Sequence, residues 1–542
     1  MAKNILWVLG TIFLFSCSSQ KSADLIVHNA KVYTVDNQFT VAEAFAVKDG
    51  KILEVGASKD ILSKYQGETL DAEGNAIFPG FIDGHAHFYG YGAGLQNANL
   101  VGTKSWDEIL EKLKAFSIEN PEGWIIGRGW DQNDWPTKEF PDNQKLNELF
   151  PNRPVILSRV DGHAAIANKF ALDLAGLKPN QKIEGGEIET VQGKLTGILV
   201  DNAEGLVVSK IPAPSAKQIR ESLLDAQRNC FAVGLTTVTD CGISHELIPI
   251  ISDLQKENQL KMRIYGMLSD NAANYEYLFK NGAVKTERLN IRSFKVYMDG
   301  ALGSRGACLL EPYSDKASTS GFLLSAKTHF EEVAKKIAEK GFQMNTHAIG
   351  DSANREILSI YGRVLKGKND ARWRIEHAQV VNQEDFKLFG NNSVIPTVQS
   401  THATSDMYWA ADRLGSERVK GAYAFKQLLD QNGWLVLGTD FPVEDINPMF
   451  TFYSAVVRKD QKNYPETGFQ MENSLSREEA IRGMTIWAAK GNFEEKEKGS
   501  LEVGKFADFI ILDQDLMKAD AANLFKTKVL KTYLNGEKVY AK

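Results

Sequence analysis

The feature that most constrains this chain is a succession of short apolar runs that alternate, in several places, with amphipathic helix patterns. One helix pattern extends from His329 to Lys340, with Gly341 directly after it as a C-terminal cap. Strands separated by helices are typical of parallel βαβ units, and eight of them predict a closed (β/α)₈ TIM barrel of the α/β class. The strand-like runs are Phe81–His87, Leu235–Asp240, Arg263–Ser269, Ser293–Asp299, Phe342–His347, Arg372–His377, Val394–Val398 and Trp434–Asp440.

Both ends of the chain are rich in β-forming residues. Asp49-Gly50 near the N-terminal end and Asn535-Gly536 near the C-terminal end are hairpin signals between such runs. We therefore expect residues 24–75 and 500–542 to form one small β-sandwich domain, with the barrel at residues 76–499 between them.

The stretch from residue 88 to residue 212 is too long for a single βα loop. It contains strand candidates of its own at Trp124–Arg128 and Val155–Val160. We expect it to form an inserted subdomain after the first barrel strand.

The first residues have the pattern of a targeting signal. Lys3 precedes an apolar run from Ile5 to Phe15, which is shorter than the about twenty residues that span a bilayer. Leu14-Phe15-Ser16-Cys17 resembles the cleavage box of bacterial lipoproteins. We expect residues 1–16 to be a lipoprotein signal peptide, Cys17 to be lipidated and residues 17–23 to be a tether in the bacterial cell envelope. The alternative is an ordinary secretory peptide.

The charge of the chain bears on its partners, and its cysteines bear on disulfide bonds. The chain has 63 Lys and Arg against 69 Asp and Glu without a basic block, so nucleic acid is not an expected partner and a small-molecule substrate is. Apart from Cys17, the cysteines Cys230, Cys241 and Cys308 are odd in number and lack CxxC spacing, so no disulfide framework is expected. Cys230 lies on the apolar side of a helical pattern and is expected in the core.

Histidines and carboxylates end most of the strand-like runs. The carboxyl ends of barrel strands meet at one mouth, where active sites form. His85 and His87 are two residues apart, so on a strand their imidazoles leave the same face and can share one ion. The alternative to a shared metal site is that these four histidines are separate buried structural residues, each with its own hydrogen-bond partner. The residues at the run ends are His85, His87, Asp299, His347, His377 and Asp440.

Several segments resemble a known family. Pro79-Gly-Phe-Ile-Asp-Gly-His-Ala-His87 is similar to the first-strand signature of the amidohydrolase superfamily. Further segments, found in the same order along nearly the whole chain, resemble amidohydrolase family 3, the group similar to N-substituted formamide deformylase. They are Gly127-Arg-Gly-Trp-Asp131, Asp161-Gly-His-Ala-Ala165, Lys295-Val-Tyr-Met-Asp-Gly-Ala-Leu-Gly-Ser-Arg305, Asn345-Thr-His-Ala-Ile-Gly-Asp351, Arg374-Ile-Glu-His377 and Leu437-Gly-Thr-Asp440.

The resemblance implies a ligand for each metal position. His85, His87 and Asp440 would bind the more buried of two divalent ions, and His347 with His377 the more exposed one. Lys295, if carboxylated, would bridge them, because a carbamate supplies anionic oxygens where an ammonium would repel the ions. The alternative is a lysine paired with Asp299 and a mononuclear site. Zinc suits this set best, although manganese or iron would also fit.

The implied chemistry is hydrolysis of a carbon–nitrogen bond in an amide, formamide or cyclic amide by a metal-activated hydroxide. Asp440 would transfer the proton, and His163 would help to polarise the substrate carbonyl. Ester hydrolysis or isomerisation in the same superfamily is an alternative, as is a non-catalytic lipid-anchored binding or regulatory protein.

Loop residues of the family-like segments are candidates for substrate contact: Arg128, Trp130, Asp131 and Arg305. Packing is the alternative for Trp130, and a structural ion pair is the alternative for Arg305. The remaining histidines have no partner set in the sequence and are expected to be structural or surface residues. They are His28, His245, His329 and His402.

Overall fold

The computed structural model describes residues 20–542. The expected signal peptide and Cys17 lie outside these residues. The last residues of the expected tether do not form a linker, because Lys21 and Ser22 pair with Tyr65 and Gln66 as part of a strand. Within residues 20–542, no helix has both the length and the apolar character needed to cross a bilayer.

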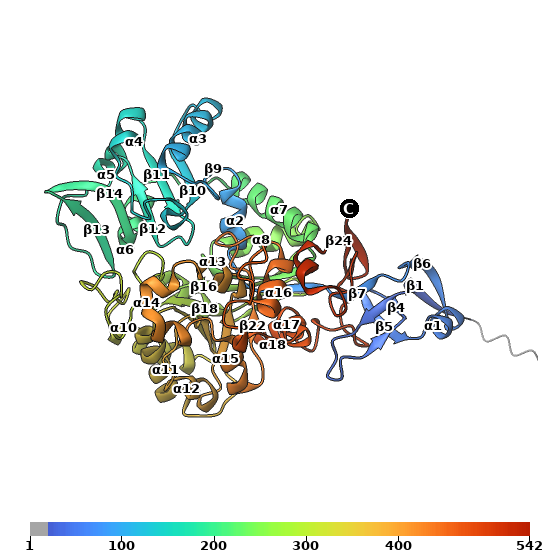
Figure 1. Cartoon of the computed structure of the whole chain (residues 1–542). Helices are drawn as coiled ribbons and strands as arrows, with labels where there is room; N and C mark the ends of the chain where they lie inside the picture. The colour runs from blue at the N-terminus through green and yellow to red at the C-terminus, as the bar shows by residue number, and fades with distance from the viewer. Residues whose placement is uncertain (1–19) are drawn as a thin grey trace, which may run out of the picture.

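The centre of the protein is a nearly closed barrel of eight parallel strands, as the alternation of runs predicts (Figure 1). Neighbouring strands are paired in the order β22-β21-β20-β19-β18-β16-β15-β8. A short β17 (Val284–Lys285) adds an antiparallel partner to β18. The barrel strands are β8 (Phe81–Ala86), β15 (Leu235–Ile243), β16 (Arg263–Ser269), β18 (Leu289–Tyr297), β19 (Gln343–Ala348), β20 (Arg374–His377), β21 (Ile395–Val398) and β22 (Val436–Leu437).

β22 and β8 are not paired as strands, and the seam between them is held by a close approach at Gly84 and by hydrogen bonds of the following residues. A Cβ atom on Gly84 would lie 2.1 Å from Val436 Cγ1, so only glycine permits the approach. The backbone N–H of Asp440 donates to the carbonyl of His85 at 2.8 Å. Asp83 ties the same seam, because its carboxylate accepts the Thr439 hydroxyl at 2.7 Å. The seam therefore brings His85 and Asp440 together from opposite ends of the barrel sequence.

Helices surround the barrel and cover its apolar outer surface. The pattern expected from His329 is α10, whose buried residues Phe330, Val333 and Ile337 share one face. Cys230 is buried within α7, in the main core. The helices are α2 (Phe88–Gly94), α7 (Ala216–Ala232), α8 (Leu247–Lys256), α9 (Ala272–Asn281), α10 (Lys327–Glu339), α11 (Asp351–Leu365), α12 (Phe386–Asn391), α13 (Ser400–Asp406), α14 (Ala410–Arg418), η2 (Val419–Gly421), α15 (Phe425–Asn432), α16 (Pro448–Val457), η3 (Met471–Asn473), α17 (Arg477–Gly483) and α18 (Ile486–Gly491).

A second sheet stands between β8 and β15 in the sequence and forms the upper left part of Figure 1. Its strands alternate between two apolar faces: Val155 and Leu157 of β11 enter one core, and Ile156 enters the other. The sheet has the order β13-β14-β12-β11-β10-β9. Its elements are β9 (Ala98–Asn99), α3 (Trp106–Glu119), β10 (Ile125–Trp130), η1 (Gln132–Asp134), α4 (Gln144–Leu149), β11 (Val155–Arg159), β12 (Ala164–Ala167), α5 (Lys169–Leu174), β13 (Gly186–Val191), β14 (Lys194–Asp201) and α6 (Asn202–Val208). We call this part the insert.

Two further sheets lie on the other side of the barrel (right in Figure 1). One has the order β5-β4-β1-β6, and the other, β25-β24-β23-β7-β2-β3, joins strands from both ends of the chain. Phe45 and Phe509 meet between them with ring centroids 5.0 Å apart. Residues 76–79, assigned to the barrel from the sequence, pair here as β7, so the first barrel strand begins at Phe81.

The elements of these sheets are β1 (Lys21–His28), β2 (Lys31–Tyr33), β3 (Val41–Ala42), β4 (Ala44–Lys48), β5 (Lys51–Gly56), α1 (Ser58–Lys64), β6 (Tyr65–Asp71), β7 (Ala76–Pro79), β23 (Phe509–Leu512), η4 (Ala521–Lys526), β24 (Val529–Leu534) and β25 (Glu537–Ala541).

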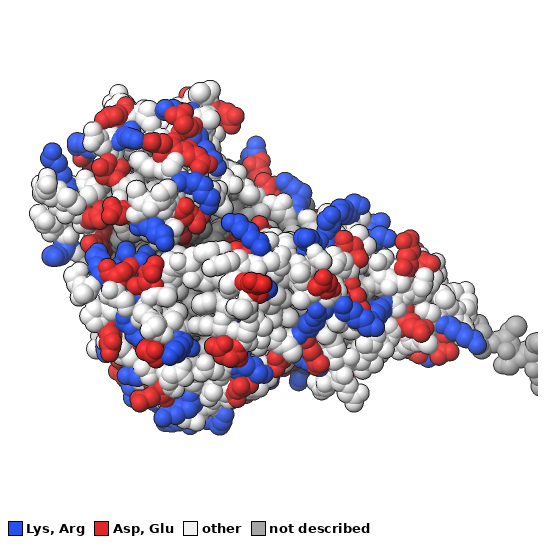
Figure 2. Space-filling view, in the orientation of Figure 1, with Lys and Arg blue, Asp and Glu red and all other residues white. Residues whose placement is uncertain are grey.

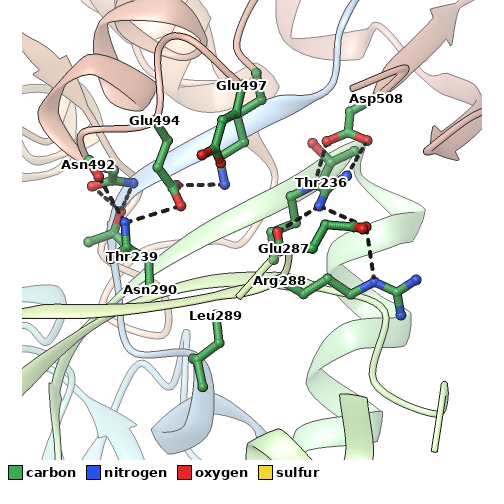
Figure 3. Close-up of polar contacts among 12 residues, drawn as sticks. Thr236, Thr239, Glu287, Arg288, Leu289, Asn290, Asn492, Glu494, Glu497 and Asp508 are labelled. Carbon is green, nitrogen blue, oxygen red and sulfur yellow. Dashed lines mark hydrogen bonds and ion pairs between the residues drawn. The ribbon is translucent and has the colours of Figure 1, made fainter. Parts of the chain in front are cut away.

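Buried polar contacts join the amino-terminal ends of the barrel strands to the C-terminal segments (Figure 3). Arg263, the first residue of β16, is fully buried and donates to Asp508 at 2.7 and 3.1 Å. Asn290 Nδ2 donates to Glu494 at 3.2 Å. This end of the barrel is thus occupied by structural pairs, and the opposite end is left for a site.

Candidate metal centre and active site

A cavity of about 600 Å³ opens at the carboxyl ends of the barrel strands. His87, Lys295, His347, His377 and Asp440 line it, and the buried His85 lies directly behind Asp440. The structure therefore brings together all six residues for which the resemblance implies metal binding.

Asp440 is at the centre of this group. Its Oδ1 lies 3.2 Å from His87 Nε2 and 3.5 Å from His85 Nε2. One ligand atom each from His85, His377 and Asp440 lie within 4.8 Å of one another. Lys295 Nζ lies 3.3 Å from His85 Nε2. The side chains thus converge on a volume small enough for an ion.

The protonation states of these residues suit a divalent cation. Burial lowers the pKa of His85, His347 and His377 well below the usual 6.5, so these imidazoles are neutral at pH 7. Burial alone would raise the pKa of Asp440, but the contact with His87 and nearby positive charges hold it below its usual value. The buried Oδ1 of Asp440 accepts no hydrogen bond of normal geometry from the described residues. Neutral nitrogens around an unsatisfied anionic oxygen are the donor set that a metal of the zinc type requires.

Two residues orient the histidines from behind. Glu376 Oε2 lies 2.5 Å from His85 Nδ1, and Gln399 Oε1 lies 2.7 Å from His377 Nδ1. Such partners set the tautomer and the ring direction of a metal-binding histidine. Neither Glu376 nor Gln399 was predicted from the sequence to belong to the site. Strict strand alternation places Glu376 on the face opposite His377, and His377 departs from strand geometry with a positive φ of 74°.

His402 is also part of the site, so its expected structural or surface role is wrong. Its Nε2 lies 3.6 Å from Asp440 Oδ2, and its ring stacks on that of His377 with centroids 5.9 Å apart. It is the third residue of α13, which begins two residues after β21. The prediction considered histidines at the ends of strand-like runs, so it could not identify a site histidine that lies on a helix.

The alternative pairing of Lys295 with Asp299 is not found. Asp299 instead accepts the backbone N–H groups of Cys308, Ile349 and Gly350 at 2.8–3.0 Å. Its role is to shape the loops at the mouth. Lys295 is fully buried and its Nζ faces His85 and the ring of Tyr297.

His163 lines the cavity from the insert, with its ring centroid 5.0 Å from that of His347. Burial alone would lower its pKa, but its hydrogen bond to Asp201 raises the pKa to about 9. Asp131 also lines the cavity and is paired with the buried Arg159. Arg159 was not singled out from the sequence, because a charged residue inside a β-strand has no local mark of function.

Three candidates for substrate contact are placed outside the cavity lining. Trp130 is completely buried in the insert and its Nε1 donates to the carbonyl of Leu157 at 2.7 Å. Arg128 donates to the carbonyl of Val160 at 3.0 Å. Arg305 pairs with Asp315 at 2.8 Å. Packing and ion pairing account for these side chains.

The comparisons with known proteins agree with this geometry. Residues 68–540 match the model of the amidohydrolase family. Protein LONG AFTER FAR-RED 3 of Arabidopsis thaliana is 32% identical over 538 residues, covering 96% of this chain and 92% of the relative. Putative amidohydrolase YtcJ of Bacillus subtilis (strain 168) is also 32% identical over 538 residues, covering 95% and 99%. N-substituted formamide deformylase of Arthrobacter pascens is 25% identical over 537 residues, covering 95% and 97%.

Among solved structures, an uncharacterized metal-dependent hydrolase from Pyrococcus horikoshii OT3 is similar, with a TM-score of 0.74 and 27% identity. The match covers 92% of this chain and 99% of that one. The barrel, with histidines and an aspartate gathered at its mouth, is that of a metal-dependent hydrolase. The chain belongs to the amidohydrolase family.

Proposed function

We propose that this protein hydrolyses a carbon–nitrogen bond in a small molecule, such as a non-peptide amide, a formamide or a cyclic amide. The observation that carries the proposal is the group of neutral imidazoles around the ionised Asp440 in the wall of the cavity. The similarity to a formamide deformylase supports this choice of bond.

His85, His87, His347, His377 and Asp440 would hold one or two divalent ions, of which zinc suits the donor set best. When bound, such an ion lowers the pKa of a water molecule to about 7 and polarises a carbonyl oxygen.

The residues of this chain would supply the proton transfers. Asp440 is ionised, and among the described residues its Oδ1 accepts no hydrogen bond of normal geometry, so this oxygen can take a proton and pass it to the leaving nitrogen. His163 approaches the same space from the insert and would contact the substrate carbonyl.

Lys295 would bridge the two ions as a carbamate. Its amine is buried beside His85 and has no carboxylate partner within ion-pair distance among the described residues, so a protonated amine would be costly beside bound cations. Electron density beyond Nζ in a crystal of metal-loaded protein is the expected result. Lys295→Ala should lose most of the metal. A bare amine in an active, fully metal-loaded crystal would contradict the bridge.

The experiment that tests the function combines metal analysis with turnover. Purified protein should contain one or two equivalents of transition metal and should release amine from a panel of N-formyl and N-acyl compounds. Exhaustive chelation should abolish this activity, and added zinc should restore it. Full activity in protein proven free of metal would refute the proposal.

We also propose that Cys17 carries a lipid that anchors the protein to the bacterial cell envelope. The support is the sequence Leu14-Phe15-Ser16-Cys17 after a short apolar run.

A further inference from the structure

The insert contributes a histidine and an aspartate that meet at the mouth of the barrel. His163 directly precedes β12, and Asp201 is the last residue of β14. These strands are antiparallel neighbours, and the backbone N–H of Asp201 donates to the carbonyl of His163 at 3.1 Å. The His163 Nδ1 and Asp201 Oδ1 atoms are 2.6 Å apart. The sheet register therefore fixes both residues in one position relative to the cavity.

The backbone of Asp201 adopts a conformation that glycine would adopt at lower cost. Its φ is 50° and its ψ is −122°, a combination that L-residues rarely show. Such strain persists where the surrounding structure imposes it, and it gathers at functional sites. A carboxylate is therefore present here at an energetic cost, which indicates that the side chain has a task.

The barrel loop after β18 leaves room for this carboxylate. A Cβ atom on Gly300 would lie 2.4 Å from Asp201 Oδ2, and one on Gly306 would lie 2.3 Å from the same oxygen. Next to it, the Asn202 side chain donates to the carbonyl of Leu324 at 2.9 Å. Only 1% of the Asp201 side chain is exposed. Insert and barrel thus enclose the carboxylate between them.

Within residues 20–542, no acid other than Asp201 pairs with the ring of His163. Asp161, the nearest alternative, accepts the backbone N–H of His163 at 3.1 Å and pairs through its other oxygen with Arg159. Since Nδ1 is used by Asp201 and the ring lines the cavity beside His347, Nε2 is the nitrogen that remains for a ligand.

We propose that Asp201 is a positioning residue: it keeps the proton of His163 on Nδ1 and fixes the ring so that Nε2 contacts the substrate. The contact with substrate rests on the proposed function, whereas the position of the proton does not. A buried carboxylate that holds an imidazole in one tautomer in this way is worth much of the activity of that imidazole. The insert is then a required half of the active site, not only a cover.

Two variants separate this role from a structural one. Asp201→Gly removes the carboxylate and relieves the backbone strain, but it also leaves the His163 ring without its partner, so its activity is measured well below its own thermal midpoint. Asp201→Asn keeps the shape and removes the charge. Both should lower kcat/KM by about 10–100-fold. Glu204→Gln is the matched control. Glu204 is another carboxylate of the insert, and it accepts a hydrogen bond from the Ser158 hydroxyl at 2.6 Å, not from His163. It should change kcat/KM by less than about twofold.

A double variant tests whether Asp201 acts through His163. In a His163→Gln background, Asp201→Gly should cause no further loss, because the two residues act as a unit. Additive losses, or a lowered thermal midpoint that accounts for the lost activity in Asp201→Gly, would overturn the proposal in favour of a structural role.

Nitrogen-15 spectra of histidine-labelled protein test the tautomer without any substrate. In spectra recorded above the pKa of about 9 of His163, where the ring is neutral, the signal that His163→Gln removes should show a protonated Nδ1 in the wild type and an unprotonated Nδ1 in Asp201→Gly. An unprotonated Nδ1 in the wild type would refute the proposal. If no compound in the panel is hydrolysed, the proposed function fails, and the spectra still decide the role of Asp201.

Discussion

Glu376 should control how tightly the metal centre binds its ion. Its Oε2 lies 2.5 Å from His85 Nδ1, and neither side chain is exposed. Glu376→Gln keeps an oxygen that can accept the Nδ1 proton but removes the charge. Glu376→Leu removes the acceptor and leaves Nδ1 buried without a partner. The two variants therefore weaken the support of His85 in two steps, while His85 itself is unchanged.

The size of the effect follows from the role of such carboxylates. Loss of a partner that orients a metal-binding histidine costs about 10–100-fold in metal affinity. We place Glu376→Gln near the lower limit, about tenfold, because an acceptor remains. We place Glu376→Leu near the upper limit, about 100-fold, which corresponds to about 2.8 kcal/mol.

The assay is equilibrium dialysis of purified protein against zinc buffered by a competing chelator, with elemental analysis of the protein. Glu494→Gln is the control. Glu494 is equally buried but pairs with Lys498 at the opposite end of the barrel. This control should lower stability and leave zinc affinity within about twofold of the wild type. If Glu376→Leu bound zinc as tightly as the wild type, Glu376 would not control metal affinity. An equal loss of zinc affinity in Glu376→Leu and in the control Glu494→Gln would also refute this role.

The remaining predictions concern proton transfer, the barrel floor and the lipid anchor. Asp440→Asn should lower kcat by about 10²–10⁴-fold in samples shown to retain metal; near wild-type turnover with metal bound would place the base elsewhere. Asp508→Ala leaves the cation of Arg263 buried without its partner and should destabilise the fold by about 3–5 kcal/mol, seen as a lowered unfolding midpoint. Asp173→Ala, in an exposed pair, should cost about 0–1 kcal/mol, and equal losses would contradict the role of burial. Cys17→Ala should move the protein from the membrane fraction to the soluble fraction without loss of activity; wild-type protein that never incorporates labelled fatty acid would rule out the anchor.

The barrel could be predicted because its signals are local. Each strand needs only a short apolar run, and the hairpins need only residues that accept positive φ, such as Asp49 at 49° and Asn535 at 52°. The metal ligands could be proposed for the same reason. In a barrel the carboxyl ends of all strands meet, so a histidine at a strand end is placed at the mouth by topology alone.

What surrounds those ligands was decided only by the tertiary structure. The pairing of Glu376 with His85 depends on how β20 and β8 meet across the barrel, and the approach of His402 to Asp440 depends on the helix α13 at the mouth. Only the structure shows that Asp131 lines the cavity whereas its neighbour Trp130 is buried in the core of the insert. The physical reason is that a residue's type and its neighbours in sequence determine which contacts it can make, whereas the partners it has depend on distances between segments far apart in the chain.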